Sequence, residues 1–301
     1  MKALVTGASG FAGRHLVAHL TEAGDSVIAC DRAGVDAVDI VDRDAVHQAF
    51  ARFQPEVVYH LAALTHVGDS WNEPQAVLRV NVEGTLNVLD AAQAAGVRRV
   101  LVVGSAEEYG RAGTEYPLRE DAPLLPNSPY AATKVAASYL ALQAYLGAGL
   151  ETVRVRAFNH TGPGQTDRFL IPALARRIAE AERDGHDHIT VGSLDPVRDI
   201  NDVRDIVRAY RLAVLEGEPG AVYNVCSGAG HSVGEIAAAL LARARVRLRL
   251  VQDPNLVRPV DVPSLIGDAS RLRAATKWQP AFTLEATLVA VLDEARANAA
   301  R

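Results

Sequence analysis

The chain has 301 residues, of which 49% are hydrophobic, so it has enough apolar surface for one large domain or two small ones. Its formal net charge of -5 argues against a general attraction for nucleic acid or for an anionic membrane surface. The chain enters a strand pattern at once without a cationic leader, and no apolar run reaches the length of about 18 residues that a membrane span needs. We therefore expect a soluble, cytoplasmic protein without nucleic-acid or membrane partners.

The first half of the chain alternates short runs rich in Val, Ile and Leu with longer helical segments. Strands are predicted at 2–6, 26–30, 56–62, 98–104 and 151–158, and helices at 11–23, 42–52, 74–95 and 129–147. Continuous apolar strands separated by helices are typical of a parallel sheet that is covered on both faces. The predicted fold class is therefore α/β, with a doubly wound parallel sheet.

The pattern changes after Phe158, where loops that contain Gly and Pro become frequent. The later predicted elements are a helix at 170–183, a strand at 221–227 that returns to the sheet, a helix at 233–243, a strand at 246–251 and a helix at 284–299. These pieces predict a smaller C-terminal lobe over the edge of the sheet where ligands enter.

The turn after the first strand reads "TGASGFAG" and places Gly7, Gly10 and Gly13 before the first helix. Glycines there allow a pyrophosphate to approach the helix N-terminus, where free amide groups and the dipole favour anions. Asp31 ends the second strand, where a carboxylate can hold the ribose hydroxyls of NAD, whereas Arg32 beside it could pair with the 2′-phosphate of NADP. The pattern predicts a Rossmann-type sheet that favours NAD(H) and leaves NADP(H) possible.

This prediction divides the chain into two parts. Residues 1–157 plus about 198–230 are expected to form the NAD(P)-binding domain, and about 158–197 plus 231–301 the substrate-binding lobe.

A reactive constellation is predicted from two further segments. "PYAATK" places Tyr130 and Lys134 one turn apart on one helix face. A neighbouring ammonium and a nicotinamide ribose would lower the pKa of the phenol, which makes Tyr130 a usable proton donor. Ser105 ends a parallel strand, on the side of the sheet where ligands bind, and its hydroxyl can polarise a carbonyl that Tyr130 protonates.

Together with "HLAA" at 60–63 and "RAFNHTGPGQ" at 156–165, these motifs resemble the extended short-chain dehydrogenase/reductase family of nucleotide-sugar enzymes, over nearly the whole chain. The resemblance implies that Ser105, Tyr130 and Lys134 are catalytic. It implies cofactor contacts from Gly7, Gly10, Phe11, Gly13, Asp31, Arg32, Asp39, Ile40, Leu61, Ala62, Ala63, Thr65, Val103, Tyr130, Lys134 and Phe158. It implies substrate contacts from Ser105, Glu107, Asn159, Leu170, Arg198 and Arg258.

The resemblance also implies a homodimer in which helices 74–95 and 129–147 form a four-helix bundle across a two-fold axis. Independently of the family, Arg198 and Arg258 suit a diphosphate, because guanidinium groups bind phosphate oxygens in pairs.

The segment "SAE" separates two reactions within the family. Related 4,6-dehydratases carry a Glu base here, preceded by a residue that can donate a proton, because departing hydroxide must be protonated. Ala106 has no proton to donate, and ketone reduction does not need one at that position. We therefore expect NAD(P)H-dependent reduction of the 4-keto group of a nucleotide-activated 6-deoxy sugar, with Glu107 as a sugar ligand or a structural residue. The resemblance further implies that this sugar is GDP-linked. A 4,6-dehydratase, a 4-epimerase with tightly held NAD and a non-catalytic dinucleotide sensor are the alternatives.

Three other patterns carry weaker signals. "GHSVG" at 230–234 matches a hydrolase nucleophile motif, but Ser232 followed by Glu235 is a helix capping box. His186 and His188 lie in a short polar link without a third ligand nearby, so we expect no metal site. The two cysteines, Cys30 and Cys226, are expected to be buried free thiols.

Overall fold

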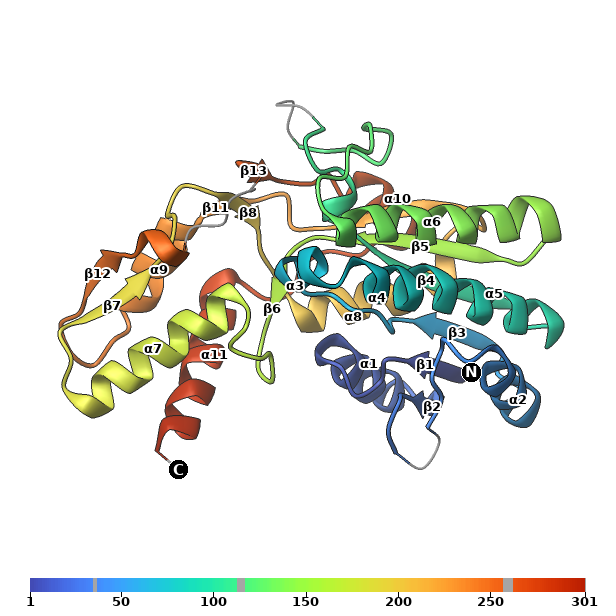
Figure 1. Ribbon diagram of the computed structural model, residues 1–301, viewed down its shortest axis with the longest axis horizontal. Coiled ribbons are helices and arrows are strands. Elements are labelled where there is room, and N and C mark those ends of the chain that lie inside the picture. The colour runs from blue at the N-terminus through green and yellow to red at the C-terminus, as the bar shows by residue number, and fades with distance from the viewer. Residues whose placement is uncertain (35–36, 113–116, 257–261, 301) are drawn as a thin grey trace.

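The computed structural model describes residues 1–34, 37–112, 117–256 and 262–300. Its centre is a six-stranded parallel sheet with the strand order β10-β5-β4-β3-β1-β2 (Figure 1). The strands are β1 (Lys2–Thr6), β2 (Ser26–Cys30), β3 (Val57–His60), β4 (Arg99–Ser105), β5 (Thr152–Ala157) and β10 (Val222–Val225). The predicted doubly wound sheet and the return of the strand near residue 222 are confirmed.

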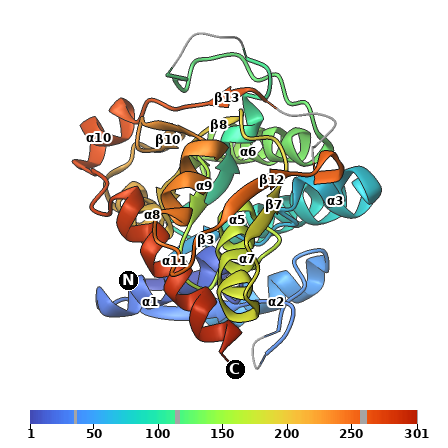
Figure 2. The same cartoon turned by 90° about the vertical axis from the view of Figure 1, so that its left-hand side faces the viewer.

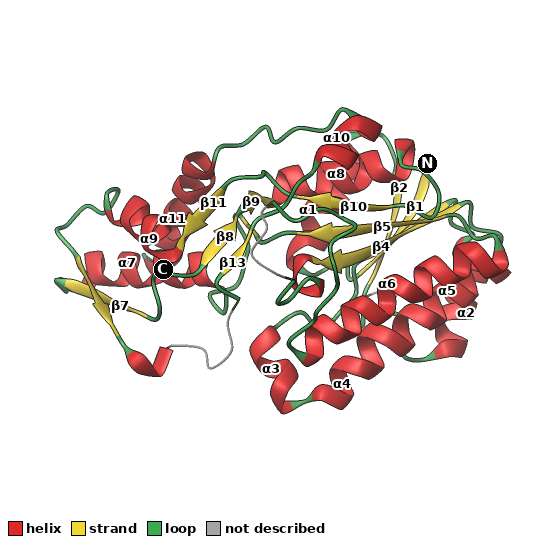
Figure 3. Cartoon of the chain, turned by 90° about the horizontal axis from the view of Figure 1, so that it is seen from above, coloured by secondary structure: helices red, strands yellow, loops and turns green. Residues whose placement is uncertain are grey.

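Helices cover both faces of this sheet, because successive side chains of each strand point to opposite faces (Figure 3). On one face, Ala3 and Val5 of β1 belong to the same apolar cluster as α1 (Phe11–Glu22) and α8 (Val203–Glu216). On the other face, Leu4 joins a cluster with α2 (Arg43–Phe53), α5 (Gly84–Ala94) and α6 (Pro129–Ala148).

Helix α8 was not among the predicted helices. Its buried residues include Val203, Ile206, Tyr210 and Ala213, which repeat with the spacing of one helix face, and Asp202 caps its first turn. The charged residues between them obscured this period in the sequence.

The helix predicted at 74–95 is divided in the structure. It consists of α4 (Pro74–Leu78), a π-helical turn η1 (Arg79–Glu83) and α5, and a short helix α3 (Val67–Asn72) precedes it. The π-turn carries Asn81, whose side chain accepts a hydrogen bond from Leu64 N (2.8 Å) and donates one to Leu64 O (3.1 Å). The loop after β3 is therefore held by the turn that interrupts the helix.

A third apolar cluster lies beyond the sheet, among helices that Figure 2 shows together. It joins α7 (Leu170–Asp184), α9 (Val233–Leu241) and α11 (Leu284–Ala299), with the paired strands β7 (His188–Val191) and β12 (Arg249–Gln252) beside them. Shorter elements connect the two parts: β6 (His160–Thr161), β8 (Val197–Asp199), β9 (Asn201–Asp202), β11 (Gly230–Ser232), η3 (Pro254–Leu256) and β13 (Ser264–Leu265).

One part of the C-terminal region packs on the sheet rather than on this third cluster. Helix α10 (Ser270–Thr276) contributes Leu272, and the fully buried Trp278 follows it; both belong to the apolar cluster of α1 and α8. Within the described ranges, no helix has the length and apolar character to cross a membrane.

Candidate active site

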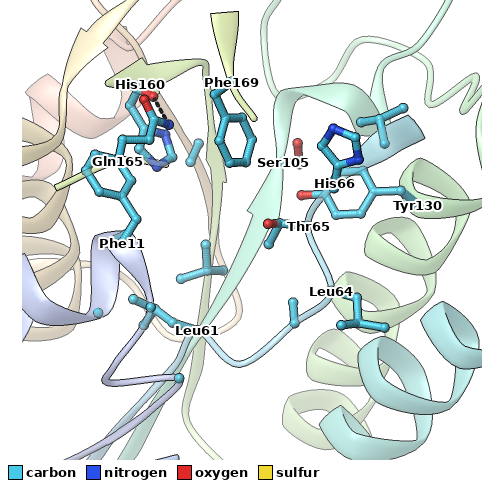
Figure 4. A pocket seen from close by; sticks show the side chains of 18 of the residues that line it. Phe11, Leu61, Leu64, Thr65, His66, Ser105, Tyr130, His160, Gln165 and Phe169 are labelled. Atoms are coloured by element: carbon cyan, nitrogen blue, oxygen red, sulfur yellow. Dashed lines mark hydrogen bonds between the residues drawn. The ribbon is translucent and has the colours of Figure 1, made fainter. Parts of the chain in front are cut away.

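A cavity of about 850 Å³ opens at the carboxyl ends of the parallel strands, between the sheet and the C-terminal region (Figure 4). Every residue predicted to bind cofactor or substrate lines this one cavity, except Arg258, which lies outside the described residues. Figure 4 shows Ser105, Tyr130, Thr65 and His66 on one side and Phe11, His160 and Gln165 on the other. The topology thus brings together side chains that lie far apart in the sequence.

The glycine-rich turn has the shape that a dinucleotide pyrophosphate requires. Gly7 has φ +70°, and a Cβ there would lie 2.8 Å from the Cα of Ala62. A Cβ on Gly13 would lie 2.1 Å from the Gly7 carbonyl oxygen. Gly10 caps α1 without a side-chain hydrogen bond, which leaves the first-turn amides to an anion. These residues therefore fit a dinucleotide.

Asp31 lies where the adenosine ribose of such a cofactor is expected. One carboxylate oxygen accepts hydrogen bonds from Ser9 N (3.0 Å) and Ser9 Oγ (2.6 Å), and the other accepts one from Arg32 N (2.8 Å). Burial acts to raise the pKa of Asp31, but these hydrogen bonds outweigh it and lower the pKa. Sequence reasoning missed Ser9, although its position inside the glycine-rich turn was the available signal.

The catalytic candidates come from β4 and α6. Ser105 ends β4, and Tyr130 and Lys134 lie in the first two turns of α6, which Ser128 caps by accepting a hydrogen bond from Ala131 N. Lys134 Nζ donates to the carbonyl oxygen of Val103 (2.8 Å). Burial lowers the pKa of Lys134 to about 8.

The lowered pKa expected for Tyr130 is not seen in the protein alone. Burial raises its pKa, the hydrogen bond with Ser105 acts to lower it, and the carboxylates of Glu107 and Glu108 add to the increase. The phenol is therefore kept protonated, which suits a proton donor, and the Lys134 ammonium is directed at the Val103 carbonyl.

The two carboxylates after Ser105, those of Glu107 and Glu108, lie in different surroundings. Glu107 is half-buried and lines the cavity. Glu108 is 0% exposed and forms an ion pair with Arg156 (Nε to Oε2, 3.0 Å). Ala106, which lies between Ser105 and Glu107, is buried and apolar, so the turn offers the cavity one carboxylate and no acid beside it.

The C-terminal region supplies the other wall of the cavity. Asn159 and Leu170 are exposed there and Arg198 is half-buried. Sequence reasoning did not single out Arg177, which lines the cavity and donates to the carbonyl oxygen of Thr190 (2.6 Å). Arg177 lies two turns after Leu170, a predicted substrate contact, on the same face of α7, and this spacing was the signal that could have found it.

Residues of both walls also meet at the rim. The ring of Phe169 lies edge-on to His66 (6.1 Å between centroids), and Arg168 forms an ion pair with Asp69 of α3.

The weaker sequence signals have structural explanations. Ser232 and Glu235 form the expected capping box at the start of α9. His60 is buried between the hydroxyls of Thr6 and Thr85, and His186 and His188 are exposed. Among the residues that the structure describes, no three His, Cys, Asp or Glu side chains are grouped so that they could hold a metal ion.

Comparison with known proteins extends this description. Residues 3–226 match the NAD dependent epimerase/dehydratase family. The chain is 36% identical to a GDP-6-deoxy-D-mannose reductase of Pseudomonas aeruginosa, over 96% of this chain and 95% of that protein.

Two solved structures share the fold over almost the whole chain. The structure of RMD from Pseudomonas aeruginosa complexed with NADPH has a TM-score of 0.90 at 35% identity and covers 99% of this chain and 100% of its own. A Thermus thermophilus UDP-glucose 4-epimerase in complex with NAD has a TM-score of 0.85 at 28% identity and covers 98% of this chain and 99% of its own.

Proposed function

The chain belongs to the NAD dependent epimerase/dehydratase family, and from this premise we propose that it reduces the 4-keto group of a nucleotide-linked 6-deoxy sugar with NAD(P)H. The best-supported substrate is GDP-4-dehydro-6-deoxy-D-mannose, which would give GDP-D-rhamnose. The similarity to a GDP-6-deoxy-D-mannose reductase over nearly the full length of both chains supports this choice.

The observation that carries the proposal is the composition of the turn after β4. Ser105 and Tyr130 face the cavity together, whereas Ala106 is 2% exposed and has no proton to donate. A dehydratase would need both a base and an acid at the sugar. Glu107 could serve as a base, but the turn supplies no acid beside it, and reduction needs none.

Each side chain has a separate role in the proposed reduction. NADH or NADPH, when bound, supplies the hydride. The Ser105 hydroxyl donates a hydrogen bond to the 4-keto oxygen, and Tyr130 gives its phenolic proton to that oxygen as charge develops there. Lys134, whose ammonium donates to the Val103 carbonyl one helical turn after Tyr130, supplies the positive charge that would stabilise the resulting phenolate.

The second lobe is proposed to bind the nucleotide. Arg198 and Arg258 are expected to hold the diphosphate, and Asn159 and Leu170 the sugar and the base. The apolar cluster of α7, α9 and α11, separate from the two clusters on the sheet, supports a substrate-binding lobe of about 158–197 plus 231–301, although α10 and Trp278 pack on the sheet. Residues 1–157 plus about 198–230 would then form the dinucleotide-binding part.

We also propose that two copies associate through α4, α5 and α6. These helices expose large apolar side chains: Leu78 (56%), Leu86 (48%), Tyr139 (56%) and Leu146 (72%). Large exposed apolar side chains gathered on neighbouring helices support an association site there. The symmetric dimer is the commonest arrangement for such a surface.

The proposed reaction is tested by supplying the purified protein with GDP-4-dehydro-6-deoxy-D-mannose and NADH, and separately with NADPH. Dinucleotide oxidation should match sugar consumption, and GDP-D-mannose alone should yield no 4-keto-6-deoxy product. Tyr130→Phe, which keeps the ring and removes the hydroxyl, should lower kcat at least about 100-fold while dinucleotide binding changes little.

Each alternative function predicts a different result. Formation of the 4-keto-6-deoxy product from GDP-D-mannose would show a dehydratase. Interconversion of sugars without net dinucleotide oxidation would show an epimerase. Dinucleotide binding without turnover of any GDP-, UDP- or dTDP-linked sugar would show a sensor.

A further inference from the structure

A buried ion pair lies beneath the cavity, outside the group of residues that line it. Glu108, the last residue of η2 (Ala106–Glu108), is 0% exposed, and Arg156 on β5 is 4% exposed. Removing two charges from water costs several kcal/mol per ion, and an apolar pair of similar volume is often at least as stable. Stability alone is therefore a weak reason for placing a charged pair here.

The pair contacts the end of the strand that carries Ser105. One carboxylate oxygen of Glu108 accepts a hydrogen bond from the backbone N–H of Ser105 (2.9 Å), and the other accepts from Arg156 Nε (3.0 Å). The Ser105 hydroxyl in turn accepts from Glu107 N (3.2 Å). The backbone and the side chain of Ser105 are thus both held within a single short turn.

The surrounding residues keep Glu108 in one position. Arg156 also donates to Tyr109 Oη and to the Glu120 carbonyl oxygen, both at 3.0 Å, and its guanidinium lies over the Tyr109 ring at 4.8 Å. Gly104 pairs with Arg156 in the register of β4 and β5, and a Cβ on Gly104 would lie 2.1 Å from Glu108 Oε1. The glycine leaves the space through which the carboxylate reaches Ser105.

We propose that Glu108 is a positioning residue for the reduction: acting through the Ser105 backbone and anchored by Arg156, it holds the Ser105 hydroxyl beside Tyr130. The assignment rests on the proposed function because that function makes Ser105 the group that polarises the keto oxygen. Glu108 lies outside the cavity lining and works through Ser105 alone. Other charged side chains that interact with this turn are Glu107 from the turn itself, Lys134 from α6 and Arg154 from β5.

Glu108→Gln tests the proposal with little change of shape. An amide has one acceptor oxygen where the carboxylate has two, and the charged Arg156 guanidinium is the stronger donor, so the oxygen should stay with Arg156 and Ser105 N–H should face an NH2 group. We expect kcat to fall about 10- to 100-fold, the range that small misplacements of reacting groups produce, while KM and the Kd of the dinucleotide stay within about three-fold. A lower kcat with nearly unchanged KM and Kd is what a positioning role predicts.

Glu151→Gln is the matched control. Glu151 accepts hydrogen bonds from Arg99 Nε (3.0 Å) and Nη2 (2.7 Å) at the opposite end of the same two strands. This variant removes a carboxylate paired with arginine far from the cavity, so it should lower the midpoint of urea unfolding and leave kcat unchanged. If Glu108→Gln reduces kcat no more than Glu151→Gln does, the positioning role is wrong.

A second measurement does not depend on the sugar. With dinucleotide bound, amide hydrogen exchange at Ser105, followed by NMR, should be at least about ten-fold faster in Glu108→Gln than in the wild type or Glu151→Gln, because the N–H loses its acceptor. Unchanged exchange would overturn the proposal. If exchange accelerates as expected but no 4-keto sugar is reduced by the wild type, the proposed function fails and the positioning of Ser105 by Glu108 stands.

Should Glu108→Gln fail to fold, the double variant Glu108→Leu/Arg156→Met removes both charges at similar volume. The same kcat and exchange measurements then apply to it, with the same expected and contrary results.

Discussion

Lys134 is a buried lysine, 6% exposed, and its burial leads to a prediction about how stability changes with pH. Burial lowers its pKa to about 8 in the folded protein, from the ordinary value of 10.5 for an exposed lysine. Between these pH values the unfolded chain holds a proton that the folded chain has lost, so this group makes folding more favourable as pH rises through the window.

Lys134→Met has no titrating group at this position, so its free energy of unfolding should not show this increase as pH rises. The free energy of unfolding of the variant, relative to the wild type, should fall by about 2–3 kcal/mol between pH 7.5 and 10. Urea unfolding of both proteins across this range measures the difference. A difference that does not vary with pH would show that Lys134 titrates as an exposed lysine does.

Cofactor choice is also decided at single residues. Asp31 is held ionised by Ser9 and Arg32, and a carboxylate at this point repels the 2′-phosphate of NADPH. We expect NADH to bind more tightly than NADPH. In Asp31→Ala, the ratio of the NADPH dissociation constant to the NADH dissociation constant should fall by about ten-fold, or 1.4 kcal/mol. Fluorescence titration with both dinucleotides measures the two dissociation constants.

Arg32→Ala provides the comparison for that titration. If the exposed guanidinium of Arg32 attracts the 2′-phosphate, this variant should weaken NADPH binding and leave NADH binding unchanged. Wild-type protein that binds NADPH ten-fold more tightly than NADH would show that Arg32 outweighs Asp31.

At the scale of elements, the close packing of η2 against β4 and β5 requires a glycine at position 104. A Cβ at Gly104 would lie 2.1 Å from Glu108 Oε1 and 2.8 Å from the Val155 carbonyl oxygen, and that backbone oxygen cannot move without disturbing the sheet. Gly104→Ala should therefore lower the free energy of unfolding by about 1–3 kcal/mol, as overpacking of a core does.

Gly147→Ala is the control for this substitution. Gly147 is exposed near the end of α6, and its added methyl group would meet only the end of the Gln143 side chain. Alanine at that site should stabilise the helix by up to about 1 kcal/mol. Chemical unfolding of both variants should give shifts of opposite sign, and a stable Gly104→Ala protein would mean that Glu108 readily vacates its position.

The elements that sequence reasoning found are those whose patterns are local. The limits of β1, β2 and α11 agree with the prediction, because apolar runs and caps such as Thr283 mark them directly. The π-turn that holds Asn81 could not be predicted, since its cause is a contact with Leu64, seventeen residues earlier in the chain. For the same reason, the different surroundings of Glu107 and Glu108 depend on Arg156 from another strand.

At the scale of the whole molecule, the exposed apolar side chains on the helices beside the sheet require an explanation. Leu78 lies on α4, Leu86 on α5, and Tyr139 and Leu146 are two turns apart on one face of α6. These helices also pack against one another, so the four side chains belong to neighbouring elements (Figure 3). Their burial against a second copy would remove this surface from water, which favours association in proportion to its area.

The last prediction follows from that surface. The wild type should sediment as a dimer, or a multiple of one, at micromolar concentration, whereas the double variant Leu86→Glu/Tyr139→Glu should sediment as a monomer, because carboxylates facing each other across a two-fold axis would be both desolvated and repelled. Leu215→Glu is the control, since Leu215 on α8 is 40% exposed on the opposite face of the sheet, and it should leave the sedimentation coefficient unchanged. A wild type that sediments as a monomer would contradict the proposed dimer. A double variant that remains dimeric would place the contact elsewhere on the molecule, and the exposed side chains of α4, α5 and α6 would then have to be explained by a different partner.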